Sequence, residues 1–129
     1  MSKICILLAD DHRMVREQLA IRLSREDDFE IVGIASSSRE TLQKAQVVRP
    51  HLLLMDPMMR DGLGVATLRQ VHSSFPKLVI VVLTAYVDTA LNMLFQEIGI
   101  RHILTKGIES SQLVAELRAA YILHRRNRD

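Results

Sequence analysis

The sequence of 129 residues is 48% hydrophobic and 25% charged, with a formal net charge of +2. These values suit a single globular domain with its own core, and the charge is too small to indicate nucleic-acid binding by the whole chain. The single cysteine excludes zinc held by a cysteine cluster. No apolar run is as long as the roughly 18 residues of a membrane span. The first residues lack a cleavable signal pattern, so we expect a cytoplasmic protein.

Apolar or β-branched runs predict five strands, and apolar residues at helical spacing predict a helix after each strand. We expect the strands at residues 3–9, 29–35, 52–56, 78–84 and 102–105. We expect the helices at about 12–25, 37–49, 65–75, 88–98 and 110–121. This alternation predicts a parallel sheet with helices on both faces and right-handed crossovers.

Residues that cap helices mark several of the predicted boundaries. Ser37 opens a capping box, and Asp88 suits the N-cap of the fourth helix. Gly99 stands where a left-handed C-cap is expected. Asp10 or Asp11 would cap the first helix. The charged end of the chain, residues 124–129, should fray.

Polar residues follow four of the predicted strands: Asp10, Asp11, Asp56, Thr84 and Lys106. Because the carboxyl ends of parallel strands lie on one edge of a sheet, we expect these side chains to share one pocket. A lone aspartate at such a junction is often only an N-cap, and a lone threonine or lysine carries little information. Their joint occurrence favours a functional site.

The residue types in this pocket suit a metal ion and a phosphoryl group. Three neighbouring carboxylates repel one another unless cations are present, and oxygen ligands are those that Mg²⁺ prefers. We expect Asp11 and Asp56 to bind Mg²⁺ directly and Asp10 to bind it through water. Thr84 and Lys106 are suited to bind phosphoryl oxygens as charge spreads over them during transfer.

The full set of motif residues is Asp10-Asp11, Asp56, Thr84-Ala85 and Lys106. With this set the sequence resembles a response-regulator receiver domain of two-component signalling, in the CheY-like superfamily. The resemblance implies a doubly wound, flavodoxin-like (βα)5 fold with a five-stranded parallel sheet in the order 2-1-3-4-5. It also implies that Ala85 helps Thr84 and Lys106 to bind the phosphoryl group.

The resemblance further implies that Asp56 accepts a phosphoryl group from a histidine kinase or a phosphotransfer protein in a Mg²⁺-dependent step. The carbonyl oxygen of Met58 would be another ligand of the metal. The aspartyl phosphate would later hydrolyse with the participation of the domain itself. Because self-phosphorylation and autodephosphorylation would be its only chemistry, we do not expect an enzyme that acts on a separate substrate.

Finer features resemble the NarL/FixJ-type subfamily and lie in four stretches: Ala9–Arg16, Ile31–Ala35, Arg49–Asp56 and Leu104–Gly107. Many members regulate transcription through a C-terminal LuxR-type DNA-binding domain, whose sequence is absent from these 129 residues. We expect a receiver domain at 1–122 and a charged tail or the start of a linker at 123–129. The domain itself should bind neither nucleic acid nor membrane. Two alternatives stay open, an excised fragment and a stand-alone receiver, as does homodimerisation.

Several positions depart from the family pattern or should modulate the chemistry. Pro57 directly follows the phosphoacceptor and removes an N–H group, while Arg60 replaces the usual proline and adds a cation. Ile103 stands where an aromatic switch residue is common. Tyr86 should lie near the pocket mouth and shield the phosphoryl group. Met59, like the residue before it, is expected to be exposed for partner contact.

The sequence favours three other functions less than the phosphoacceptor switch. A phosphorylation-independent pseudo-receiver, acting as an interaction module, has only the altered loop 56–60 in its favour. A Mg²⁺-dependent phosphohydrolase would resemble enzymes with an acid two residues after the nucleophile, where this chain has Met58. An FMN carrier is disfavoured because the acidic loop 9–12 would repel phosphate in the absence of a metal.

Overall fold

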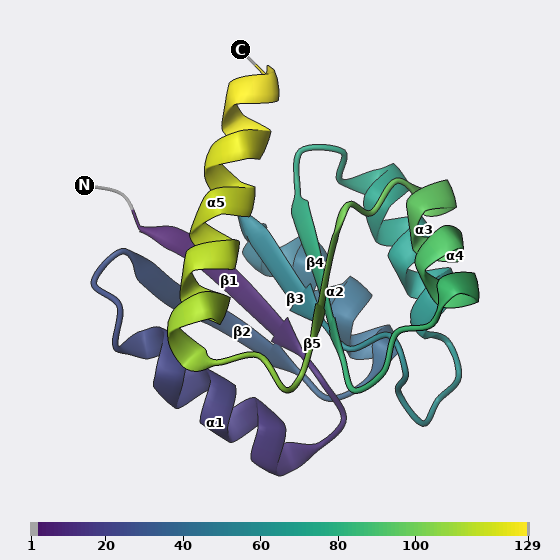
Figure 1. Ribbon diagram of the computed structural model, residues 1–129, viewed down its shortest axis with the longest axis horizontal. Coiled ribbons are helices and arrows are strands. Elements are labelled where there is room, and N and C mark those ends of the chain that lie inside the picture. Colours follow the sequence, from purple (N-terminus) through teal and green to yellow (C-terminus); the bar gives the residue numbers. More distant parts are fainter. Residues whose placement is uncertain (1–2, 129) are drawn as a thin grey trace.

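The computed structural model describes residues 3–128 and forms a sheet flanked by helices (Figure 1). Strands and helices alternate strictly along the chain, as predicted. In chain order the elements are β1 Ile4–Ala9, α1 Arg13–Ser24, β2 Phe29–Ala35, α2 Ser38–Val48, β3 Leu52–Met55, α3 Gly64–Ser74, β4 Val79–Thr84, α4 Thr89–Ile98, β5 His102–Thr105 and α5 Ser110–Arg128.

The sheet contains five parallel strands in the order β2-β1-β3-β4-β5, which confirms the predicted fold class. β3 is therefore the central strand. At its end Met55 pairs with Ala9 of β1 on one side and with Val82 of β4 on the other. The residues that follow β1 and β3 are consequently neighbours at the carboxyl edge of the sheet.

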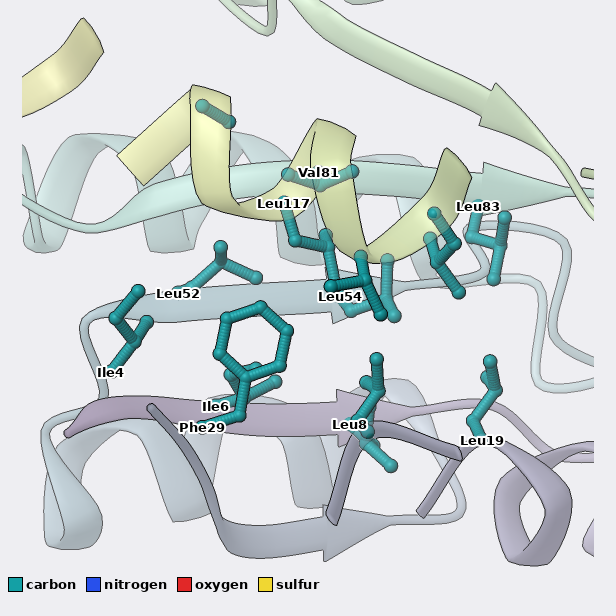
Figure 2. Packing of buried hydrophobic residues seen from close by; sticks show 14 of the residues in the cluster. Ile4, Ile6, Leu8, Leu19, Phe29, Leu52, Leu54, Val81, Leu83 and Leu117 are labelled. Carbon is teal, nitrogen blue, oxygen red and sulfur yellow. The ribbon is translucent and has the colours of Figure 1, made fainter. Parts of the chain in front are cut away.

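Each face of the sheet carries its own apolar core, because alternate residues of a strand point to opposite faces. Leu52 and Leu54 of β3 pack with residues of α1 and α5, as Figure 2 shows for Leu19 and Leu117. Leu53 and Met55 belong to the second core, under α2, α3 and α4. β3 is buried along its whole length, which explains why its sequence is a continuous apolar run.

The predicted caps are mostly confirmed. The hydroxyl of Ser37 accepts the N–H of Glu40, the carboxylate of Asp88 accepts that of Leu91, and Gly99 ends α4 with a φ of 106°. The prediction that Asp10 or Asp11 caps α1 was wrong. His12 occupies the N-cap, and its own N–H donates to the Asp10 carboxylate at 2.8 Å. This contact forms a turn ahead of the helix.

The C-terminal helix is longer than predicted. α5 runs from Ser110 to Arg128, past the helix end predicted near residue 121, while residue 129 lies outside the described residues. The expected fraying of the charged end stays a prediction. The proposed boundary between residues 122 and 123 stays a prediction. Across residues 3–128, no helix combines the length and the apolar character needed to cross a membrane.

Arg118 fastens α5 to the loop before β2. Its Nε and Nη2 donate to the two oxygens of Asp28 at 2.7 and 2.8 Å, and Nη2 also donates to Glu26 at 3.0 Å. The guanidinium lies 5.2 Å from the centre of the Phe29 ring. The Arg118 hydrogen bonds lower the pKa of Asp28, since they favour its charged form.

We predict that Arg118→Ala lowers the free energy of unfolding by about 1 kcal/mol near pH 7, measured by urea titration. The figure is modest because both side chains of the pair are 37% exposed and water screens them. Asp28 has a depressed pKa in the folded state. Its contribution is therefore complete above the unfolded value of about 4 and is lost as the pH falls through the folded value.

The control is Arg13→Ala, which removes one exposed pair with Glu17. It should leave the urea unfolding curve nearly unchanged near pH 7. An Arg118→Ala curve that coincides with the wild-type curve at pH 7 would contradict the anchoring role.

Candidate functional site

Asp10 and Asp56 stand side by side at the carboxyl edge of the sheet, with relative exposures of only 3% and 4%. The strand ladder fixes the backbone of both. The Asp10 N–H donates to Ala35 at 3.1 Å, and the Asp56 N–H donates to Ala9 at 2.9 Å. Arg16 of α1 donates to the carbonyl oxygen of Asp10 at 2.8 Å. The predicted phosphoacceptor is thus held rigidly beside a second buried acid.

The ammonium group of Lys106 lies between these two carboxylates. Its Nζ is 2.7 Å from Asp10 Oδ2 and 2.6 Å from Asp56 Oδ2. Burial would lower the pKa of Lys106, but the hydrogen bonds and charges of the two acids raise it above its usual value. The Lys106 N–H donates to the Thr84 carbonyl at 2.8 Å, which fixes the start of the lysine side chain.

Asp11 faces a different cation. Its Oδ2 accepts the backbone N–H of Arg60 at 2.7 Å and the side-chain Nε at 3.2 Å, and its carbonyl accepts Nη2 at 3.2 Å. Burial would raise the pKa of Asp11, but the Arg60 contacts lower it overall. Asp11 Oδ1 is buried and, among residues 3–128, accepts no hydrogen bond.

Asp10, His12 and Asp56 each bring one possible ligand atom to within 4.8 Å of the others. The side chain of His12 is 60% exposed, yet Nδ1 is 3.1 Å from Asp10 Oδ1 and 3.2 Å from Asp11 Oδ1. The acids supply the oxygen donors that Mg²⁺ requires, so the site fits a hard cation. An imidazole nitrogen is a poorer ligand for that ion.

The loop after β3 turns back onto Asp56. The Met58 N–H donates to Asp56 Oδ1 at 2.8 Å, so the chain keeps one N–H on the acceptor although Pro57 supplies none. Gly64 is needed for this path, since a Cβ there would lie 1.7 Å from the Pro57 carbonyl oxygen. The prediction of an exposed Met59 was wrong, because it is 4% exposed and packs in the second core. Met58 is exposed, as expected.

Asp61 anchors the same loop and was not singled out by the sequence. Its carboxylate accepts the N–H and the hydroxyl of Ser38 at 2.7 and 2.8 Å, and the N–H of Leu63 at 3.0 Å. The Leu63 N–H is the main reason that the pKa of Asp61 is lowered. The dipeptide Asp61-Gly62 signals a turn, but nothing in it names a partner on α2.

The other predicted site residues lie at the ends of β4 and β5. Thr84 is buried and pairs with Thr105, directly before Lys106. Ala85 and Tyr86 follow it and are exposed, Tyr86 at 69%. Ile103 is partly buried against the second core, like an ordinary strand residue. The modulating roles of Tyr86 and Ile103 therefore stay predictions.

Residues 6–118 match the family model described as the response regulator receiver domain. This chain belongs to the response-regulator receiver family. It is thus a receiver domain of two-component signalling, and the predicted family is confirmed. The six motif residues that led to the prediction are Asp10, Asp11, Asp56, Thr84, Ala85 and Lys106.

Individual relatives agree with this receiver assignment. The response regulator protein VraR of Staphylococcus saprophyticus is 31% identical over 118 residues, which cover 92% of this chain and 56% of the relative. VraR of Staphylococcus aureus is 36% identical over 85 residues, 66% of this chain and 41% of the relative. The chain therefore spans about half the length of the relatives that it matches.

Solved receivers share the fold. A LuxR-family two-component response regulator from Aurantimonas superposes with a TM-score of 0.87 at 23% identity, covering 94% of this chain and 86% of the other. The receiver domain of the putative response regulator NarL from Mycobacterium tuberculosis gives 0.85 at 23% identity, covering 93% and 98%. At this level of identity the two structures show that the fold is shared.

We predict that Lys106→Met destabilises the receiver by roughly 2–4 kcal/mol near pH 7, because it leaves two buried carboxylates without their shared cation. Asp56→Asn in the same protein should restore part of this loss, since one of the two like charges is then gone. Urea unfolding of the two single variants and the double variant measures both effects.

Lys77→Met serves as the control, because Lys77 is exposed, and it should change the free energy of unfolding by less than about 0.5 kcal/mol. If Lys106→Met unfolds at the same urea concentration as Lys77→Met, the bridging lysine does not stabilise the acid pair.

Proposed function

We propose that this receiver is a phosphoacceptor switch in which Asp56 takes a phosphoryl group from a histidine kinase or a phosphotransfer protein. One observation carries the proposal. The Asp56 carboxylate is buried at the end of the central strand and is held 2.6 Å from the Lys106 ammonium. A carboxylate fixed beside a cation is placed to attack phosphorus and to have the new charge compensated.

In the proposed transfer, an oxygen of Asp56 forms a bond to phosphorus while the bond from phosphorus to the donor imidazole nitrogen breaks. The imidazole keeps the electron pair. Lys106 and the Thr84 hydroxyl then bind oxygens of the transferred group, with Ala85 at the edge of the same site. Autodephosphorylation later returns the carboxylate, so the domain has no other substrate and we do not propose an enzyme in the usual sense.

The proposal includes a divalent ion. Asp11, Asp56 and the Met58 carbonyl would hold Mg²⁺, with Asp10 acting through water. The oxygen donors fit it, and the buried Asp11 Oδ1, which accepts no hydrogen bond among residues 3–128, is suited to receive a cation. When bound, Mg²⁺ supplies positive charge that offsets the charge of the acids and of the phosphoryl group.

Phosphorylation would act by stabilising one of two conformations, since only one state brings Thr84 and Lys106 fully onto the phosphoryl group. We propose that the resulting change alters contacts with a partner or with a DNA-binding output domain, and that the output is transcription regulation in the cytoplasm. The family resemblance supports this output, and the names of the LuxR-family structures are consistent with it.

A pseudo-receiver that works without phosphorylation is the second candidate. One observation favours it: Arg60 contacts Asp11, the acid that should bind the metal. Mg²⁺ titration separates the two functions, because a pseudo-receiver has no need of the ion and a phosphoacceptor requires it.

We predict that the protein, incubated with Mg²⁺ and acetyl phosphate and quenched rapidly, gains the mass of a single phosphoryl group. Asp56→Asn should abolish this adduct, because the amide is a far weaker nucleophile. Asp27→Asn is the matched control, since Asp27 is an exposed acid outside the site, and it should be phosphorylated like the wild type.

The cognate kinase is the second donor in the same intact-mass measurement. If neither donor yields an adduct that depends on Asp56, the phosphoacceptor function is wrong and the pseudo-receiver takes its place.

A further inference from the structure

Arg60 is a cation of this chain that occupies a predicted metal ligand. Its backbone N–H and its Nε both donate to Oδ2 of Asp11, and its Nη2 donates to the Asp11 carbonyl. The two residues are 49 positions apart, so these contacts join the loop after β1 to the loop after β3. Lys106, which follows β5, bridges Asp10 and Asp56 separately.

The arrangement follows from the residue type at position 60. A proline at position 60 would supply neither an N–H group nor a charge. The arginine in this chain supplies both, and both are directed to the same carboxylate oxygen. Asp11 is thereby held by a donor set that a proline could not provide.

The position of Asp11 reflects this contact. Asp10, His12 and Asp56 bring ligand atoms within 4.8 Å of one another, and among residues 3–128 Asp11 is outside that group. Its carboxylate is 8% exposed, and Oδ1 accepts no hydrogen bond within the same range of residues, although His12 Nδ1 lies 3.2 Å from it. A buried carboxylate oxygen that accepts no hydrogen bond costs free energy. Asp11 is therefore suited to receive a cation at Oδ1 or to exchange the cation at Oδ2.

Arg60 is the partner that can leave. Its side chain is 83% exposed, whereas that of Asp11 is 8% exposed. Departure of the guanidinium returns it to water, and a bound ion would take over the charge of the buried Asp11 carboxylate. Lys106, at 18% exposure between two buried acids, is held far more firmly.

We infer that Arg60 is an internal competitor of Mg²⁺, which holds Asp11 in the metal-free receiver and releases it when the ion binds. The inference rests on the proposed function, since it assigns Asp11 to the metal. Arg60 is therefore a positioning residue. It sets how much Mg²⁺ the receiver needs before Asp56 can be phosphorylated, and the released guanidinium is then available at the mouth of the site.

The test is a calorimetric Mg²⁺ titration of the unphosphorylated protein at constant ionic strength. Arg60→Ala should lower the Kd for Mg²⁺ by about three- to fivefold relative to the wild type, the range expected for removing one exposed charge pair. Arg13→Ala is the matched control. Arg13 is also a single-paired arginine, with an 81% exposed side chain, and its loss should leave the Kd at the wild-type value.

The outcomes separate this inference from the proposed function. If Arg60→Ala binds Mg²⁺ as the wild type does, or more weakly, Arg60 is not a competitor and the inference is overturned while the metal site stands. If Mg²⁺ binds to neither protein, the metal role in the proposed function fails as well. Binding to Arg60→Ala alone would support the inference in its strongest form.

A second readout follows Arg60 directly. The Nε–H resonance of Arg60, assigned by its loss in Arg60→Ala, should move toward the position of a solvated arginine as Mg²⁺ saturates the wild type. Asp11→Ala should give that position without Mg²⁺, because the acceptor is gone. A resonance that Mg²⁺ leaves unchanged would show that Arg60 keeps Asp11 and would contradict the exchange.

Discussion

The site depends on one lysine placed between two buried acids. β1 and β3 are neighbours in the sheet, so Asp10 and Asp56 meet at its edge although their like charges repel each other. Lys106 follows β5, which is separated from β3 by β4. Neighbouring strands lie about 4.8 Å apart, so only a long side chain can reach across the end of β4 to Asp56. A lysine suits this task because its flexible stem delivers a compact charge.

Much of this arrangement could be predicted from the sequence, because strand ends in a parallel sheet converge wherever they lie along the chain. The fold class and the meeting of Asp10, Asp56 and Lys106 needed only the pattern of apolar runs and the polar residues after them, whereas the strand order came from the family resemblance. The cap of α2 at Ser37 was equally readable, because its partner is three residues away. Local signals and topology were sufficient for these features.

Features that depend on loop geometry escaped prediction. The contact between Arg60 and Asp11 joins two loops whose relative path no periodicity specifies. Met59 reads as an exposed loop residue, yet the turn around Asp56 directs it into the core under α3 and α4. The Asp10 carboxylate accepts the N–H of His12 before the helix begins. Asp10 thus binds a backbone N–H, as a capping residue does, but His12 occupies the N-cap of α1.

The loop after β3 unites these details. Asp61 ties its far end to α2, Met58 contacts the acceptor, and Arg60 reaches the acid pair. Each anchor is a charged or polar bond made by a loop with little apolar burial of its own apart from Pro57 and Met59. Such a segment has few packed contacts to hold it, so its conformation responds to charge at the site.

The two cations of the site consequently have different roles. Lys106 is mostly buried and bridges two acids, so its removal costs the fold as well as the chemistry. Arg60 is mostly exposed and holds one acid, so its removal costs the fold little. A receiver must keep its acids close together before any ion or phosphoryl group arrives, and a permanent cation satisfies that need. The proposed exchange also needs one acid that can change partners. An arginine with a long, exposed side chain would allow that exchange without disturbing the strand ends.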